Sequence, residues 1–247
     1  MEIYRGRIDV LDYVFFATVE RGKVYQTGAF IHNYALAYAL QLATSPYTHM
    51  IQKPEYEREL APLNEAGIYL TPARPLKLSY RITQWNTVQE GYGFGKKRRD
   101  IGYPDWGFAL VLRPESSLEF YLLVNDFVSI PELSPFRNVL AGKASYIRLG
   151  KFMGKARVGL VKAHQVLEKE GAFTAGHTAS KSGRLSLLLN WRDIPADPIS
   201  CEVYPETLPT RLIQNPRFSE GKHYLAKFGD KDEVLLPAEM RFIARPI

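Results

Sequence analysis

The sequence is poor in cysteine and has no long apolar run. Cys201 is the only cysteine among 247 residues, which excludes a disulfide framework and cysteine-rich zinc sites. No apolar run approaches the roughly 18 residues that a membrane-spanning helix needs. Residues 1–17 carry polar and charged side chains where a signal peptide has a continuous apolar segment. We therefore expect a soluble, cytoplasmic protein with no membrane partner.

Catalytic motifs are equally scarce. The histidines form no HExxH pattern and no tight metal-ligand spacing, and no GxSxG nucleophile elbow occurs. His32 stands where a helix is expected to begin, and a capping or packing role is commoner there than a catalytic one. The residues therefore predict no catalytic group, no metal and no cofactor.

Aromatic and basic residues, in contrast, are abundant. Hydrophobic residues make up 46% of the chain and aromatic residues 13%, enough for a substantial core and typical of strands rather than helices. The net charge is +6 and the isoelectric point about 9.2. A moderate basic excess indicates an anionic partner but says nothing about the fold.

The first basic stretch is GYGFGKKRRDIGY, residues 91–103. It lacks the GK[ST] of a phosphate-binding loop, so its glycines indicate a loop or hairpin tip. Its aromatic rings can stack on bases while its cations follow the phosphates, which is how single strands are bound without sequence readout. The alternative is a solvated loop with no ligand. The residues concerned are Tyr92, Phe94, Lys96, Lys97, Arg98 and Arg99.

The second basic stretch, residues 143–162, contains no acidic residue. Gly150 and Gly154 bracket a turn at which backbone amides can approach a phosphate closely. The alternative is an ordinary basic hairpin on the solvent side of a sheet. Its cations are Lys143, Arg148, Lys151, Lys155, Arg157 and Lys162. A third stretch, residues 176–185, contains His177 and is more typical of a linker between strands than of a phosphate-binding loop.

The pattern of elements suggests an α+β fold. Residues 3–18 alternate like a long opening strand. Residues 30–43 are apolar almost all round, which predicts a buried helix with Asn33 as its N-cap. The segments 106–114 and 117–126 predict a strand pair joined by a turn near Glu115, and residues 134–142 predict a short helix.

This order is compatible with a βαββαβ unit. We therefore predict an RRM-like or ferredoxin-like domain over residues 1–150, with a long β-hairpin insertion near 87–104. Residues 151–247, rich in prolines and short β-like runs, are expected to form a smaller, mostly β C-terminal part.

Three stretches together resemble a known family. They are IYRGRIDVLDYVFFAT from residue 3, FIHNYALAYAL from residue 30 and YIRLGKFMGKARV from residue 146. They resemble the subunit of type I-D CRISPR Cascade complexes that belongs to the Cas-five group of RAMP proteins, which are RRM-like RNA-binding proteins. The similarity covers most of the chain and is weak after about residue 195.

The resemblance implies a non-catalytic subunit that caps one end of the guide-RNA complex. Such a subunit binds the 5-prime handle of CRISPR RNA and abuts the Cascade backbone subunit. It also helps the large subunit recognise target DNA at the PAM. Some relatives cleave RNA with a tyrosine, a lysine and a histidine, a set that has no match at the corresponding positions here.

The resemblance also implies which residues contact RNA. The family's glycine-rich loop most nearly matches Arg148, Gly150, Lys151, Gly154 and Lys155, to which we add Arg157. Residues 91–103 then correspond to a protruding hairpin that meets RNA, target DNA or a neighbouring subunit.

Two other functions remain open at this point. One is a metal-independent endoribonuclease that processes precursor CRISPR RNA, with His32 or His177 as general base. The other is a protein–protein adaptor whose basic loop binds an acidic partner or a membrane surface.

Replacing Lys96, Lys97, Arg98 and Arg99 together with alanine is expected to weaken complex assembly or target binding. With fewer phosphate contacts, binding releases fewer counterions. The affinity should therefore also depend less steeply on salt concentration. Binding measured across a salt series tests this, and an unchanged salt slope in the quadruple variant would refute it.

Overall fold

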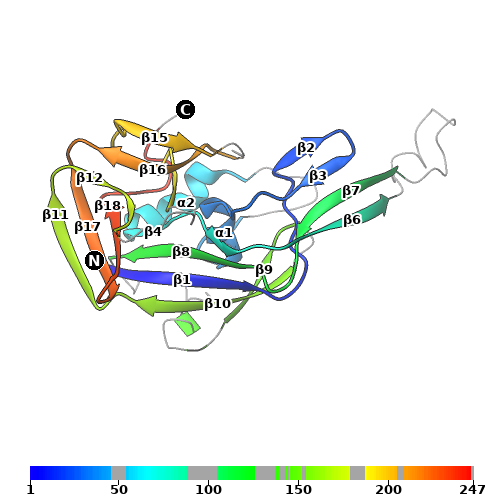
Figure 1. Ribbon diagram of the computed structural model, residues 1–247, viewed down its shortest axis with the longest axis horizontal. Coiled ribbons are helices and arrows are strands. Elements are labelled where there is room, and N and C mark those ends of the chain that lie inside the picture. The colour runs from blue at the N-terminus through cyan, green and yellow to red at the C-terminus, as the bar shows by residue number, and fades with distance from the viewer. Residues whose placement is uncertain are drawn as a thin grey trace.

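The described part of the chain is mostly β. The computed structural model describes residues 1–45, 54–87, 105–125, 137–138, 143, 145–151, 154–178, 187–204 and 209–245. Within these ranges strands dominate and there are two helices (Figure 1). The RRM-like arrangement and the α+β class stay predictions.

A six-stranded antiparallel sheet forms the centre of the molecule. Its order is β4-β8-β1-β10-β9, and β5 also pairs with β8. The strands are β1 (Glu2–Val10), β4 (Ile68–Leu70), β5 (Arg74–Lys77), β8 (Ser117–Val124), β9 (Ser145–Leu149) and β10 (Gly154–Lys162). Strand β1 is shorter than the predicted 3–18, because the amides of Leu11 and Asp12 both turn to the carbonyl oxygen of Lys155.

The two helices are α1 (Asn33–Ala39) and α2 (Tyr56–Glu65). Both contact β4, and α1 also contacts β9. The prediction that the first helix is largely buried is confirmed. Its predicted N-cap is wrong by one residue, because the ring Nδ1 of His32, not Asn33, accepts the amide hydrogen of Tyr34, at 3.3 Å. A capping role for His32 is thus confirmed.

Three four-stranded sheets surround the central one. Their strand orders are β2-β3-β7-β6, β11-β17-β18-β13 and β12-β16-β14, the last with β15 paired to β16. The strands are β2 (Val19–Arg21), β3 (Val24–Gln26), β6 (Tyr80–Thr87), β7 (Asp105–Leu112), β11 (Gln165–Glu170), β12 (Phe173–Thr174), β13 (Gly176–His177), β14 (Leu188–Asn190), β15 (Ser200–Val203), β16 (Leu212–Phe218), β17 (Lys222–Gly229) and β18 (Asp232–Pro237). Figure 1 shows β6 and β7 extending away from the rest.

The predicted pairing of 106–114 with 117–126 is wrong. Strand β7 pairs with β6 and β3, whereas β8 lies in the central sheet between β1 and β4. Both edges of β8 are therefore occupied by other strands. The chain passes between the sheets at Glu115, which has a φ of +70° and donates its amide hydrogen to the carbonyl of Val10.

Other predictions meet the structure only in part. The paired strands β6 and β7 flank residues 88–104, which lie outside the described residues, as do most of 134–142. The predicted boundary at residue 150 falls between β9 and β10, which pair with each other in the central sheet. One main core includes residues from Ile3 to Phe242, so the two predicted segments share it.

A buried polar network joins α1 to the C-terminal part. Asp193 is fully buried and accepts hydrogen bonds from Asn33 Nδ2 (2.6 Å), Tyr34 Oη (2.9 Å), Tyr69 Oη (3.2 Å) and the amide of Ile243 (2.9 Å). The side chain of Asn190 extends the network by donating to Asn33. Buried polar groups are costly unless partnered, so these bonds specify how the elements pack together.

The network predicts a specific pH dependence of stability. Burial raises the pKa of Asp193 to about 6, against the opposing effect of its hydrogen bonds. Since the folded state then binds a proton more tightly than the unfolded chain, this group's contribution falls as pH rises from about 4 to about 6. The loss is on the order of 3 kcal/mol. Denaturant unfolding between pH 4 and 7 should show it in the wild type.

Asp193→Asn should lack this decline although it is less stable at every pH, whereas Asp230→Asn, at an exposed position, should retain it. Parallel pH profiles for the wild type and Asp193→Asn would contradict the assignment.

Candidate nucleic-acid interface

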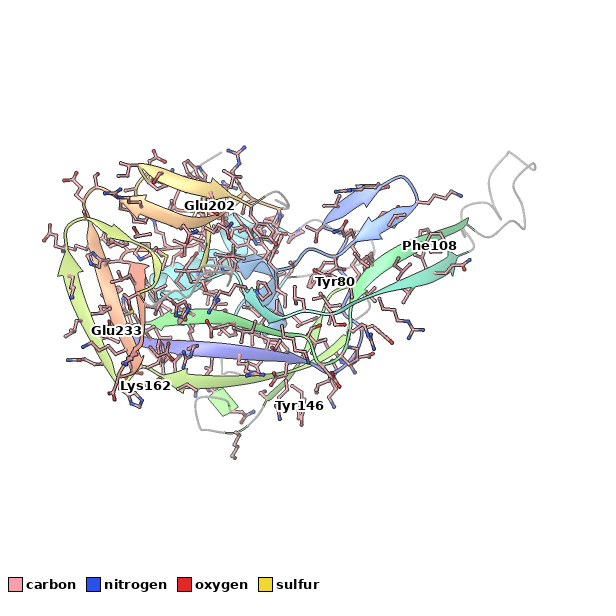
Figure 2. The ribbon with its side chains drawn as sticks, viewed as in Figure 1. Tyr80, Phe108, Tyr146, Lys162, Glu202 and Glu233 are labelled. Carbon is pink, nitrogen blue, oxygen red and sulfur yellow. The ribbon has the colours of Figure 1, made fainter. Side chains whose placement is uncertain are left out.

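The central sheet exposes a basic face at one end. Along β9, and along β10 from Gly154 to Gly159, buried and exposed residues alternate, as expected for strands covered on one side only. We call this exposed surface the outer face; it consists of Arg7, Asp9, Tyr146, Arg148, Lys155, Arg157 and Gly159. In Figure 2 Tyr146 lies well away from Glu233.

The strand register sets these side chains in cross-strand rows. Arg148 is opposite Lys155, and Tyr146 is opposite Arg157. The Lys155 ammonium lies 4.4 Å from the centre of the Tyr146 ring. Tyr146 is nevertheless 55% exposed. The outer face therefore offers an accessible aromatic ring surrounded by cations.

Asp9 holds two of the arginines in place. Its Oδ1 accepts from Arg7 Nε at 2.8 Å, and its Oδ2 accepts from Arg157 Nη2 at 2.9 Å. Partial burial alone would raise the pKa of Asp9, but the hydrogen bonds from Arg157 and Arg7 outweigh it and lower the pKa. Asp9 is thus ionised at neutral pH and orients two guanidinium groups that remain largely exposed.

Gly159 leaves the middle of the outer face open. It pairs with Arg7 across β1 and β10. A Cβ atom placed there would meet no atom within 4 Å. The surface beside Arg7 is therefore flat, and a planar group could lie against the strand backbone.

The two glycines of the turn pack against the chain itself. A Cβ at Gly150 would lie 2.4 Å from the carbonyl oxygen of Phe15, and one at Gly154 would lie 2.3 Å from that of Tyr13. The amide of Lys151 donates to Phe15 at 2.8 Å. Both glycines therefore have a packing role, and the contact of this turn with a phosphate stays a prediction.

The predicted RNA-contacting residues divide into three groups. Arg148, Lys155 and Arg157 lie together on the outer face, and Lys151 is exposed in the adjacent turn. Gly150 and Gly154 pack against the chain itself. Tyr92, Phe94, Lys96, Lys97, Arg98 and Arg99 lie outside the described residues.

The sequence interpretation missed four members of the outer face. Arg7, Asp9, Tyr146 and Gly159 were not singled out as site residues. Their signal was present as alternation, because Arg7 and Asp9 are two apart on β1, as Tyr146 and Arg148 are on β9. Which strands lie side by side could not be read from that pattern.

Both histidines considered as general bases are engaged in structural contacts. His32 is buried, burial lowers its pKa to about 3, and its Nε2 lies 2.8 Å from the hydroxyl of Thr210. His177 Nε2 lies 2.9 Å from Arg74 Nη2 and 3.0 Å from Tyr121 Oη.

The second histidine belongs to a mostly buried ion-pair cluster. Arg74 Nη2 donates to Glu119 Oε1 at 2.6 Å, and Tyr121 donates to the same oxygen at 3.1 Å. Burial would raise the pKa of Glu119, but its contacts with His177 and Arg74 lower it to about 2. The cluster links β5 and β8 of the central sheet to β13. It therefore fastens the sheet β11-β17-β18-β13 onto the central sheet.

The fold and the outer face define a mostly β protein with an exposed basic sheet surface. The chain belongs to the family of type I-D CRISPR-associated protein Cas5/Csc1, whose model matches residues 1–245. The resemblance found in the sequence is thereby confirmed. A search of curated proteins gives no match.

Two solved structures are similar over most of the chain. One is a crystal structure of a CRISPR protein from Archaeoglobus fulgidus, with 14% identity and a TM-score of 0.41, covering 96% of this chain and 100% of that one. The other is a chain in the cryo-EM structure of the type III-B Cmr-beta complex bound to cognate target RNA and AMPPnP. It has 10% identity and a TM-score of 0.43, covering 88% of this chain and 86% of that one.

The described residues contain neither a membrane-spanning helix nor a cluster of metal-binding side chains. None of their helices is long and apolar enough to cross a membrane. In the same ranges, no three His, Cys, Asp or Glu residues are grouped so as to hold a metal ion.

Gly150→Ala is expected to reduce stability by about 2 kcal/mol or more, because the residue has a φ of +75° and its Cβ would collide with the Phe15 carbonyl. Gly159→Ala, at an open strand position, should cost less than about 1 kcal/mol. Denaturant unfolding compares the two variants. Equal stabilities would contradict the packing role assigned to Gly150.

Proposed function

We propose that this protein is a non-catalytic subunit of a type I-D CRISPR Cascade complex that binds the 5-prime handle of CRISPR RNA with its outer face. Membership of the type I-D family supports a Cascade role. The observation that carries the RNA-binding part is the accessible Tyr146 ring beside Lys155, Arg148 and Arg157.

The chemistry of the outer face suits single-stranded RNA. An exposed aromatic ring can stack on an unpaired base, and neighbouring cations can contact the phosphates that flank it. Asp9 orients Arg7 and Arg157 in advance, which reduces the entropy lost when they bind. In this proposal the protein recognises backbone and shape, while base pairing by the guide reads the target sequence.

The strand order supports an RRM-like core. Along the chain the order of these strands is β1, β4, β8 and β10, and the helices α1 and α2 lie between β1 and β4. In the sheet the same strands lie in the order β4-β8-β1-β10. The first strand thus lies between the third and the fourth, as in a βαββαβ unit. We infer that the central sheet is this unit, and its outer face is then the surface free of helices.

We further propose that the protein is not an enzyme. A general base must reach its proton within hydrogen-bond distance. His32 is buried, and the Nε2 of His177 already faces Arg74 and Tyr121. If the purified protein cut a repeat-containing RNA into discrete products, and His177→Ala abolished them, the endoribonuclease alternative would replace this proposal.

The proposed partners follow from the same role. They are CRISPR RNA, target DNA near the PAM, the Cascade backbone subunit and the Cascade large subunit. The protein–protein adaptor would be favoured instead if two results came together. The subunit complexes would survive nuclease treatment, and the protein would not bind handle RNA.

The triple variant Arg148→Ala, Lys155→Ala and Arg157→Ala tests the outer face directly. Loss of three phosphate contacts should make the negative slope of log affinity against log salt shallower by about 2, at about 0.7 per contact for single strands. Binding of labelled repeat-handle RNA and a scrambled RNA across a salt series measures this slope. Tyr146→Ala should weaken binding by roughly 1–3 kcal/mol with little change in slope.

The matched control removes the same charges elsewhere. Lys169, Arg211 and Arg217 are exposed and lie outside the central sheet. Replacing all three with alanine should leave the slope close to that of the wild type. If the control and the outer-face variant lost affinity equally, binding would depend on net charge alone and the outer face would not be the site.

A further inference from the structure

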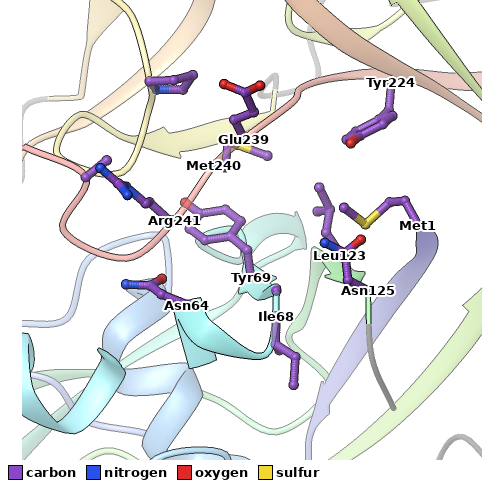
Figure 3. Close-up of a pocket in the computed structure, with 13 residues that line it drawn as sticks. Met1, Asn64, Ile68, Tyr69, Leu123, Asn125, Tyr224, Glu239, Met240 and Arg241 are labelled. Atoms are coloured by element: carbon purple, nitrogen blue, oxygen red, sulfur yellow. The ribbon is translucent and has the colours of Figure 1, made fainter. Parts of the chain in front are cut away.

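A cavity of about 530 Å³ lies where β1 begins, at the opposite end of this strand from Asp9 (Figure 3). Cavities of this size are typical of small-ligand sites. Eight residues of strand separate Met1 from Asp9, or roughly 26 Å at 3.3 Å per residue. The cavity is therefore distinct from the outer face.

The lining combines apolar groups with six polar side chains. Met1, Ile68, Leu123 and Met240 supply the apolar surface. The polar side chains are those of Asn64, Tyr69, Asn125, Tyr224, Glu239 and Arg241. Asn64 and Tyr69 are hydrogen-bonded within the protein. Asn125, Glu239 and Arg241 are exposed, so their side chains are accessible to a ligand. A few accessible polar groups around a partly apolar cavity are typical of a binding site.

The backbone beside the cavity is constrained. Glu239 has a φ of +60°, which is uncommon for a residue other than glycine. The adjacent amide of Ala238 donates to the carbonyl of Lys222 at 2.9 Å, so β17 helps hold the turn in this conformation. Across the cavity, a Cβ at Gly67 would lie 2.6 Å from Asn125 Nδ2. The backbone at Glu239 is therefore in an uncommon conformation, and the absence of a side chain at Gly67 leaves room for that of Asn125.

The charges define the kind of ligand. A carboxylate at Glu239 disfavours an anionic group inside the cavity, and a guanidinium at Arg241 disfavours a cationic one. The phosphate of a bound nucleotide would therefore remain in solvent, outside the cavity. A neutral ligand with hydrogen-bond donors on one edge and acceptors on another can satisfy both groups. The Tyr224 ring and the apolar lining favour a planar ligand, and Figure 3 shows Tyr224 across the cavity from Arg241 and Asn64. A nucleobase has this chemistry.

We propose that this cavity binds a single guanine base. Guanine presents N1–H and N2–H donors that a carboxylate such as Glu239 can accept. Its O6 and N7 acceptors suit a guanidinium such as Arg241, which is the commonest specific contact to guanine. Adenine would turn the N1 acceptor toward Glu239, and pyrimidines lack the adjacent O6 and N7 acceptors that suit a guanidinium.

The source of the base is an unpaired nucleotide of single-stranded RNA, whose bases can be turned outward and bound in pockets. This part of the inference rests on the proposed RNA-binding function. Binding of a free guanine nucleotide does not depend on it.

The full-length protein should therefore be titrated by calorimetry with GMP, AMP, CMP and UMP. The four share ribose and phosphate, so differences in affinity report the base. GMP is expected to bind at least about tenfold more tightly than the others, the discrimination that one good bidentate contact provides. Equal affinities, or no binding of GMP at millimolar concentration, would overturn the proposal.

Two variants locate the site. Glu239→Gln should reduce GMP affinity about tenfold, because an amide cannot accept from both guanine donors. Glu220→Gln, at an exposed acidic position, should bind GMP like the wild type. Unchanged GMP affinity in Glu239→Gln would place any nucleotide binding elsewhere and refute the cavity as the site.

The outcomes separate this proposal from the proposed function. The outer-face triple variant should lose handle RNA but keep GMP selectivity. GMP selectivity without any binding of handle RNA would overturn the proposed function alone. If Glu239→Gln instead released neighbouring subunits from the complex and the wild type bound no GMP, the cavity would accommodate a protein segment and the guanine proposal would be wrong.

Discussion

The arrangement of β1 between β8 and β10 is the constraint on which the structure depends. Both edges of β1 are hydrogen-bonded over most of its length, so this first strand joins segments more than a hundred residues away. The pairing with β10 sets Asp9 opposite Arg157 and thereby creates the charged centre of the outer face. The same pairing buries Ile8 on the other side, which fixes the register because a shift of one residue would reverse the faces.

Polar contacts between the elements complete this architecture. Asp193 draws together α1, β4 and the C-terminal segment, and the Arg74–Glu119 pair fastens β13 to the central sheet. Because these groups are buried, each would be costly without its partners. The outer face remains accessible where no second sheet covers it. Structural charges are thus buried and paired, while the charges proposed to bind RNA are exposed.

Local patterns in the sequence predicted some features well and others poorly. The buried helix at residues 33–39 followed from its continuous apolar character. The hairpin that was the alternative interpretation of residues 143–162 agrees with the antiparallel pairing of β9 with β10. The pairing of β7 with β8 was wrong, because adjacency along the chain cannot reveal that β8 is already paired on both edges. Arg7 shares a surface with Arg157 only because β1 pairs with the distant β10, and composition and spacing do not encode this pairing. The role of Gly150 was also hidden, since it depends on the distant Phe15 carbonyl.

The most direct test of the central claim is photo-crosslinking of handle RNA within the assembled complex, followed by mass-spectrometric mapping of the crosslinked peptides. The account predicts crosslinks in the peptide that contains Tyr146 and in β1 near Arg7. These crosslinks should disappear from the outer-face variant even when the complex still forms. Crosslinks confined to the sheet formed by β11, β17 and β18, with none on β1 or β9, would contradict the outer face as the RNA-binding surface.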